Sequence, residues 1–106
     1  MKFLTLFLIS KIVIYGKYEG IIHPPAQEYI ISLINEGERK GAEIVILMLD
    51  TPGGLDPSMR EIIKKIMNSD VPICVFVYPQ GARAASAGAF ITISAHIAAM
   101  APGTNI

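Results

Sequence analysis

Residues 43–54, EIVILMLDTPGG, decide the fold that the sequence predicts. Glu43 to Leu49 is nearly all apolar and does not alternate, so we expect a central parallel strand that is covered on both faces. The strand ends in a proline and two adjacent glycines, Gly53 and Gly54. Such residues are common in turns, but glycine backbone also lets N–H groups come close to a substrate carbonyl. The flanking sequence decides between a plain turn and a binding loop.

Strands and helices alternate on both sides of this segment. Apolar residues recur at helical spacing in two stretches, 26–34 and 59–67, which predicts two amphipathic helices. We expect the first to begin at Pro24 and Pro25 and to stop at Gly41, and the second to begin with Asp56 as the N-cap before Pro57. Further strands are predicted at 11–18 and 72–78, and a helix of small residues is predicted at 86–100.

This order predicts an α/β fold with a parallel sheet and right-handed crossovers. Ligands of such sheets gather outside the carboxyl ends of the strands. The loop at 51–54 follows one predicted strand, and the loop at 81–88, GARAASAG, follows the next. If the two strands are neighbours, both glycine-rich loops face one cleft.

Together the two loops contain the parts needed for acyl transfer. The reaction needs a nucleophile and N–H donors for the oxyanion of the tetrahedral intermediate. Gly53 and Gly54 have N–H groups without side chains, Ser86 stands at the predicted entry to a helix, and the N–H of Ala87 points into the same space. The alternative is that Ser86 only caps a helix, which is the common use of serine there. A phosphate loop is disfavoured because neither GxGxxG nor GxxxxGK[ST] is present.

Composition excludes several other classes of protein. The chain has 106 residues, enough for one small domain, and 52% of them are hydrophobic. Nine basic residues balance nine acidic ones, so nothing indicates a nucleic-acid partner. The single cysteine, Cys74, lies in a strand-like run and is expected to pack in the core. His23 and His96 stand alone, so we predict no metal site and no cofactor.

The first ten residues, MKFLTLFLIS, are apolar after one basic residue. They resemble a short signal or anchoring sequence, although a bilayer span needs about 20 apolar residues. An edge strand or an apolar tail is the alternative. We therefore divide the chain into residues 1–10, signal-like or anchoring, and residues 11–106, the folded domain.

The two loops, in the context LDTPGGLDPSMREI (49–62) and GARAASAGAFITISAHIAAMAPGTNI (81–106), resemble the protease domain of the NfeD (nodulation efficiency protein D) family. These are membrane-associated serine proteases related to the Clp protease and to signal peptide peptidase A. The similarity extends from about Ile12 to the last residue. It implies a Clp/crotonase-like fold of repeated β-α-β units, of which residues 11–106 would form the N-terminal part.

The resemblance also implies roles for single residues. Ser86 would be the nucleophile, and Gly53, Gly54 and Ala87 would form the oxyanion hole. The backbone near Leu55 would pair with an extended peptide, as in β-augmentation. Family members prefer hydrophobic peptide stretches, including part of stomatin-like membrane proteins. A membrane-associated or exported protein that forms a homo-oligomer is therefore expected.

The sequence departs from the family pattern at the general base. The family uses a lysine well downstream of the serine, whereas every lysine here lies upstream of Ser86. In the predicted helix, His96 would lie about 15 Å along the axis from Ser86, too far for a hydrogen bond. We read Asp50 as a strand-end residue that caps the turn. The chain is expected to be truncated before the base, and we expect a serine endopeptidase whose lysine comes from the missing sequence or from a neighbouring subunit. Two alternatives remain beside it: a peptide-binding or assembly module without activity, and a crotonase-type acyl-CoA enzyme. The lysines are Lys2, Lys11, Lys17, Lys40, Lys64 and Lys65.

Overall fold

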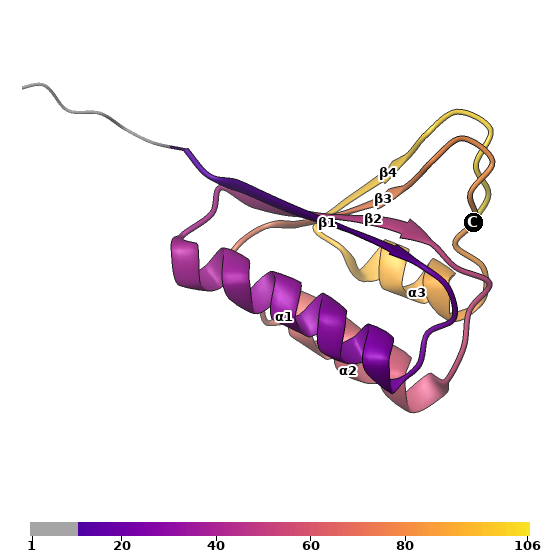
Figure 1. Cartoon of the computed structure of the whole chain (residues 1–106), viewed down its shortest axis with the longest axis horizontal. Coiled ribbons are helices and arrows are strands. Elements are labelled where there is room, and N and C mark those ends of the chain that lie inside the picture. The colour runs from indigo at the N-terminus through magenta and orange to yellow at the C-terminus, as the bar shows by residue number, and fades with distance from the viewer. Residues whose placement is uncertain (1–10) are drawn as a thin grey trace, which may run out of the picture.

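The structure, a computed structural model, describes residues 11–106, and the predicted signal-like segment at residues 1–10 lies outside them. Within the described residues, four strands alternate with three helices (Figure 1). The strands are β1 (Val13–Glu19), β2 (Ile44–Asp50), β3 (Ile73–Val77) and β4 (Ile97–Met100), and the helices are α1 (Pro24–Lys40), α2 (Asp56–Met67) and α3 (Ala87–Ser94).

The four strands form one sheet in the order β1-β2-β3-β4, with every neighbouring pair parallel. In this register Leu47 of β2 lies between Gly16 of β1 and Val75 of β3. The predicted parallel α/β sheet is therefore confirmed. Because each strand pairs with the next in sequence through a right-handed crossover, the connecting helices fall on the same side of the sheet.

The helices cover one face of the sheet (Figure 1). The side chains of β2 that face them, Val45, Leu47 and Leu49, are fully buried in the core. On the opposite face Ile46 and Met48 are only half-buried. The expectation that both faces of β2 are covered is thus wrong for residues 11–106, although the apolar character of its outer face is real.

Helix α1 begins and ends where the sequence predicts. Pro24 is its first residue, and Gly41 ends it in a left-handed conformation with φ 62°. The sequence analysis missed the cap, which is His23: its Nδ1 accepts a hydrogen bond from the N–H of Ala26 at 3.3 Å. A histidine that appeared isolated in the sequence therefore has a local structural role.

Helix α2 begins differently from the prediction. Asp56 is its first helical residue rather than its N-cap, and Leu55 holds the cap position without a side-chain bond. The carboxylate of Asp56 instead accepts a hydrogen bond from Nε of Arg60, one turn later, at 2.8 Å. The cap falls on Leu55 because its carbonyl already accepts the N–H of Met59.

The predicted helix at 86–100 is wrong in its second half. Helix α3 ends at Ser94, Ala95 is extended, and Ile97–Met100 form strand β4 beside β3. The alanines of this segment favour helix, but backbone pairing with the buried strand β3 outweighs that preference. The helix propensity of single residues does not include the energy of such pairing. His96 therefore lies between α3 and β4, and its Nδ1 accepts the N–H of Ile73 at 3.0 Å. Its role is structural, as expected, but it is not helical.

Candidate active site

The two glycine-rich loops meet at the carboxyl edge of the sheet, as the topology predicts. Thr51 forms an isolated parallel bridge with Ala84, and its N–H donates to the carbonyl of Arg83 at 2.7 Å. Gly53 lies directly against Ser86: a Cβ added to this glycine would lie 2.7 Å from Ser86 Cβ. The absence of a side chain at Gly53, with φ 109°, therefore allows the two loops to touch.

Ser86 has an unusual backbone for a helix start. Its φ is 54° and its ψ is −117°, and it is the one non-glycine residue with positive φ among residues 11–106. Its side chain makes no cap hydrogen bond to α3, and the residue is exposed. Such strain costs about 1–3 kcal/mol and is found where the surrounding structure holds a functional group in place. A serine on a sharp strand-to-helix turn is also how hydrolases expose a nucleophile. The alternative that Ser86 merely caps α3 is therefore excluded.

The backbone donors expected from the glycine loop are not equivalent. The N–H of Gly53 donates to Oγ1 of Thr51 at 3.1 Å, so it is already used. Gly54 bridges Ile22, whose N–H donates to Gly53 O at 2.8 Å and whose carbonyl accepts Leu55 N–H at 2.7 Å. In this parallel bridge Ile22 bonds to the residues on both sides of Gly54, and the N–H of Gly54 itself takes no part. The N–H of Gly54 thus faces away from Ile22.

Within residues 11–106, the N–H groups of Gly54 and Ala87 have no hydrogen-bond acceptor. Ala87 is the first residue of α3, where N–H groups lack intrahelical partners. A Cβ on Gly53 would lie 3.3 Å from Ala87 N, so this N–H also borders the contact between the loops. Of the donors predicted from the sequence, Gly54 and Ala87 are available, and Gly53 is not.

Leu55 is placed beside the site, but its backbone is occupied. Its N–H binds Ile22 O and its carbonyl accepts the N–H of Met59. Its side chain is 54% exposed. Any contact with a peptide at Leu55 would therefore involve the side chain, and a role in peptide binding stays a prediction.

Asp50 and Thr51 tie the end of β2 to the loop before Ser86. Oδ1 of Asp50 accepts the N–H of Arg83 at 3.1 Å, so its carboxylate holds the neighbouring loop rather than capping its own turn. The role of Thr51 was missed by the sequence analysis. The available signal was a hydroxyl residue directly before Pro-Gly-Gly, because Ser and Thr often bond to the backbone of the turn that follows them.

No general base contacts Ser86 in the part of the chain that the structure describes. Its hydroxyl has no hydrogen-bond partner there. Lys64 and Lys65 lie in the last turn of α2, about 12 Å along the axis from the helix start near the glycine loop. The lysine side chains contact other residues: Lys65 pairs with Glu38, Lys40 pairs with Glu36, and Lys17 lies over the ring of Tyr78.

The other nucleophilic side chain is not poised for chemistry. Cys74 is buried in β3, as expected, and desolvation by burial raises the pKa of its thiol. A thiol that stays protonated near neutral pH is a poor nucleophile. Among residues 11–106, no group of three or more His, Cys, Asp or Glu side chains could hold a metal ion.

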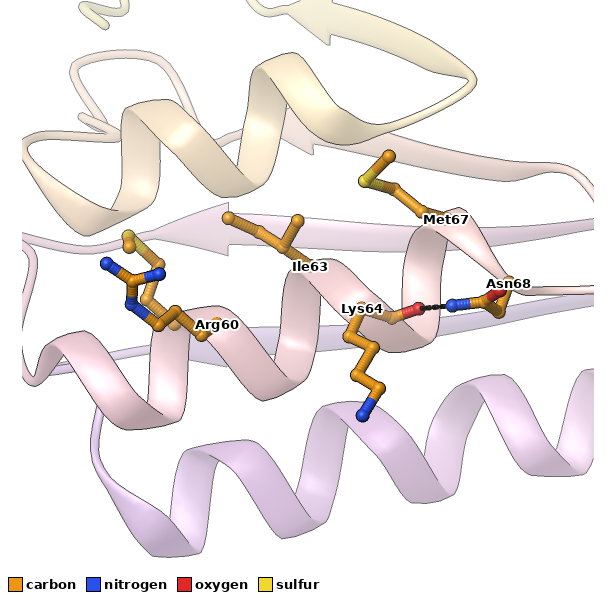
Figure 2. A pocket seen from close by; sticks show the side chains of 6 residues that line it. Arg60, Ile63, Lys64, Met67 and Asn68 are labelled. Carbon is orange, nitrogen blue, oxygen red and sulfur yellow. Dashed lines mark hydrogen bonds between the residues drawn. The ribbon is translucent and has the colours of Figure 1, made fainter.

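One hollow lies at the two loops, and another lies away from them. An open one at the carboxyl edge is lined by Glu19, Gly20, Asp50, Pro52, Gly81 and Arg83, which come from both loops and from the end of β1. Figure 2 shows the other, a groove along α2 where Ile63 and Met67 point toward α3 and Lys64 points toward α1. Asn68 closes its end through a 2.8 Å hydrogen bond to Lys64 O. None of its lining residues belongs to the contact between Gly53 and Ser86.

Comparison with solved structures defines the class of protein. An asparagine-to-aspartate mutant of ClpP1 from Listeria monocytogenes superposes with a TM-score of 0.77 at 18% identity, over 86% of this chain and 53% of that chain. At that identity the likeness shows the fold alone. The molecule is therefore a Clp-like α/β protein with a strained serine set against a glycine turn.

The chain belongs to the NfeD1b family, since the family model for the NfeD1b N-terminal domain matches residues 19–106. It is 39% identical over 105 residues, 98% of its length, to the membrane-bound protease PH1510 of Pyrococcus horikoshii. It is 40% identical over 62 residues, 58% of its length, to the membrane protein NfeD1b of Bacillus subtilis. Proteins similar to this chain are thus membrane-bound, and one of them is a protease.

Solved structures of the 1510-N protease share the fold closely. A serine-to-alanine mutant of this membrane-bound stomatin-specific protease matches with a TM-score of 0.89 at 39% identity, over 92% of this chain and 47% of that one. A lysine-to-alanine mutant in complex with a substrate peptide matches with a TM-score of 0.89 at 40% identity, over 92% and 44%. These matches confirm the predicted Clp-like fold.

The match covers only part of each curated relative. The chain spans 24% of the length of PH1510 and 14% of the Bacillus protein. Within residues 11–106, no helix is both long enough and apolar enough to cross a membrane.

Proposed function

We propose that this chain forms the nucleophile-bearing part of a serine endopeptidase. Ser86 would be the nucleophile, and the N–H groups of Gly54 and Ala87 would form the oxyanion hole. The contact between Gly53 and Ser86 carries the proposal, because it sets the glycine turn against a serine with a strained backbone and a free hydroxyl. A turn without function would need neither feature.

The chemistry follows from these positions. Oγ of Ser86 attacks the scissile carbonyl carbon and passes its proton to a base, and the two N–H groups bind the oxyanion that develops. Collapse of the tetrahedral intermediate breaks the C–N bond; the amine leaves with the proton, and an ester of Ser86 remains. Water then hydrolyses the ester, which releases the acid and restores the serine hydroxyl.

The base in this proposal is a lysine from outside residues 11–106, in the same polypeptide or in a neighbouring subunit. One observation supports a Ser–Lys pair: the similar 1510-N protease was solved both with a serine and with a lysine replaced by alanine. The hydroxyl of Ser86 contacts no lysine or histidine of the described residues, so the proposed base lies outside them. Self-association is proposed as well, since one sheet face of this chain is not covered by its helices (Figure 1).

The proposed substrates are hydrophobic stretches of membrane-associated proteins, such as stomatin-like proteins. The relative of this chain is called stomatin-specific, and another structure of it holds a substrate peptide. The exposed apolar side chain of Leu55 beside the glycine loop fits an apolar peptide. Localisation at a membrane is proposed on the same basis.

The test is the reactivity of Ser86 in the full-length protein. We expect a fluorophosphonate to label Ser86 and the protein to cleave a hydrophobic peptide, and Ser86→Ala to lower cleavage by roughly 10³-fold or more. Ser32→Ala, which removes an exposed hydroxyl on α1, serves as the matched control and should retain both properties. Cleavage that survives in Ser86→Ala would overturn the proposal.

The absence of a base beside Ser86 in residues 11–106 favours a second candidate, a module that binds hydrophobic peptides without cutting them. It predicts that peptide affinity is the same in the wild type and in Ser86→Ala, and that neither protein cleaves. Fluorophosphonate labelling of Ser86 in the wild type would count against this candidate, because labelling needs an activated hydroxyl.

A further inference from the structure

Thr51 is a fully buried polar residue at the junction of the two loops. Three parts of it make three separate contacts. Its backbone holds the loop that leads to Ser86, its hydroxyl holds the glycine turn, and its methyl group packs on helix α3.

The backbone of Thr51 fixes the position of the loop before Ser86 relative to strand β2. Its N–H donates to Arg83 O at 2.7 Å, and its carbonyl accepts the N–H of Ala85 at 3.0 Å. Ala85 is the residue directly before Ser86. These two bonds form an isolated parallel bridge beyond the end of β2, which ties the loop before Ser86 to the end of that strand.

The hydroxyl of Thr51 sets the direction of the glycine turn. Oγ1 accepts the N–H of Gly53 at 3.1 Å, and it lies 3.4 Å from Gly53 O, at the limit of a hydrogen bond. A bonded N–H at Gly53 fixes the Pro52–Gly53 peptide plane, which directly precedes the peptide that carries the N–H of Gly54. Without Oγ1 this buried donor would lose its partner, an unfavourable state that rotation of the turn would relieve.

The methyl group of Thr51 sets the position of α3. A side chain at Gly88, in the first turn of that helix, would overlap Cγ2 of Thr51. Glycine at this position lets the helix approach until its backbone rests on the threonine methyl. Ser86 directly precedes α3, so this contact adds to the backbone bonds of Thr51 in limiting how far the nucleophile can shift.

We propose that Thr51 is a positioning residue that fixes the distance and orientation between the oxyanion donors and the Ser86 hydroxyl. This inference rests on the proposed protease function. Thr51 touches no reacting atom; it acts through Gly53 on one side and through the loop before Ser86 on the other. Donors aimed at the oxyanion must be in place before the reaction, and a displacement of about 1 Å can cost about 10²-fold in rate.

The test compares two variants of the full-length protein. Thr51→Val keeps the volume and the methyl contact but removes the acceptor for Gly53 N–H, whereas Thr51→Ser keeps the hydroxyl and removes the methyl. We expect Thr51→Val to lower kcat about 10- to 100-fold with KM changed less than about threefold, because the donors act mainly in the transition state. Thr51→Ser should retain kcat within about threefold.

The matched control is Thr92→Val in α3. Thr92 is equally buried, and its hydroxyl donates to Gly88 O at 2.7 Å within α3, but it has no hydrogen bond to the glycine turn at 51–54 or to the residues before Ser86. We expect it to leave kcat unchanged. A loss of kcat as large as that of Thr51→Val would show a general effect of removing buried hydroxyls and would overturn the inference. An unchanged kcat in Thr51→Val, or an equal loss in Thr51→Ser, would overturn it as well.

Amide hydrogen exchange at Gly53 gives a readout that does not depend on catalysis. Thr51→Val should speed this exchange by about tenfold or more, and Thr51→Ser should not, since a lost hydrogen bond of about 1.4 kcal/mol corresponds to a factor of ten. Exchange that is the same in all three proteins would remove the proposed contact. Wild-type protein that neither cleaves peptide nor reacts with a fluorophosphonate would instead overturn the protease function and the role of Thr51 with it.

Discussion

The first and last helices of the molecule begin in opposite ways. Helix α1 begins with an extended residue, His23, whose ring accepts a hydrogen bond from the first turn. Helix α3 begins with Ser86, a residue type that normally caps helices, yet its hydroxyl makes no cap bond and its φ is positive. The start of α1 gains the stability of a capping hydrogen bond, whereas the start of α3 has none.

This difference indicates what each helix start is for. A capped start satisfies an orphan N–H within its own segment, and the cap contributes about 1 kcal/mol. At Ser86 the same groups are held open by contacts from outside the segment, with Gly53 on one side and Thr51 through Ala85 on the other. Strain supported in this way leaves the hydroxyl and the N–H of Ala87 free for a ligand.

Gly53→Ala should disturb the uncapped start of helix α3, at Ser86, most severely. The new Cβ would lie 2.7 Å from Ser86 Cβ, at a φ of 109° that side chains rarely adopt. We expect a loss of about 3 kcal/mol in the free energy of unfolding, and loss of fluorophosphonate labelling at Ser86, because the serine must move. Urea unfolding and labelling of the purified protein check both.

Gly41→Ala is the control for backbone strain without a contact. Gly41 also has positive φ, 62°, but a Cβ there would meet nothing within 4 Å. It should cost about 1 kcal/mol and leave labelling intact. If Gly53→Ala behaves like Gly41→Ala, the contact between the loops is less tight than the structure indicates.

Ser86→Gly should relax the strained start. Glycine adopts φ 54° without penalty, whereas alanine keeps the strain of the serine. After the larger entropy of the unfolded glycine chain is subtracted, we expect Ser86→Gly to be about 1 kcal/mol more stable than Ser86→Ala, with both inactive. Thermal unfolding of the two variants measures the difference. A less stable Ser86→Gly would mean that the backbone at Ser86 is not strained.

Much of this architecture is predictable from the sequence because its signals are strong and local. The apolar run before Thr51 and the stripe of α1 each match a single period, and Gly41 marks a helix end. Parallel neighbours then place the loops at 51–54 and 81–88 on one edge. The placement of the two loops at one edge follows from topology, whereas the direct contact of Gly53 with Ser86 also needs a glycine at residue 53.

Other features depend on partners that the local sequence does not show. Strand β4 was predicted as helix because its alanines favour helix, while its pairing with β3 is a tertiary contact. The same holds for the donors. Gly53 and Gly54 are identical in sequence terms, and only the bonds from Thr51 Oγ1 and to Ile22 separate a used N–H from a free one.

His23→Ala should weaken the capped start of helix α1 without affecting the start of helix α3 at Ser86. It removes the acceptor for the N–H of Ala26, and we expect a loss of about 1 kcal/mol in the free energy of unfolding. Labelling of Ser86 should not change. His23→Asn tests the cap itself, because asparagine is a strong N-cap residue and should recover the loss in urea unfolding. A failure of asparagine to recover it would point to packing of the histidine ring.

The far end of α1 offers the smallest effect, and it depends on pH. Oε1 of Glu38 lies 2.6 Å from Nζ of Lys65 on α2, and Oε2 accepts the N–H of Asp70 at 3.2 Å. The hydrogen bond from Lys65, and then that from the Asp70 backbone, lower the pKa of Glu38 against the opposing effect of desolvation. Both side chains are about three-quarters covered. Screening at the surface limits the gain, so Glu38→Gln should cost up to about 1 kcal/mol at pH 7.

The sign of the pH dependence follows from the lowered pKa of Glu38. In the unfolded chain its pKa is about 4.3, so the pair stabilises the fold above that pH, and the stabilisation is lost as pH falls through the lower folded pKa. The difference between wild type and Glu38→Gln in urea unfolding should therefore shrink to near zero in acid. Glu36→Gln is the control, because Glu36 pairs with Arg39 and Lys40 at the exposed surface and should show a smaller difference at pH 7. A loss in Glu38→Gln that persists unchanged in acid would assign the effect to packing between α1 and α2, since a protonated carboxyl and an amide are both neutral.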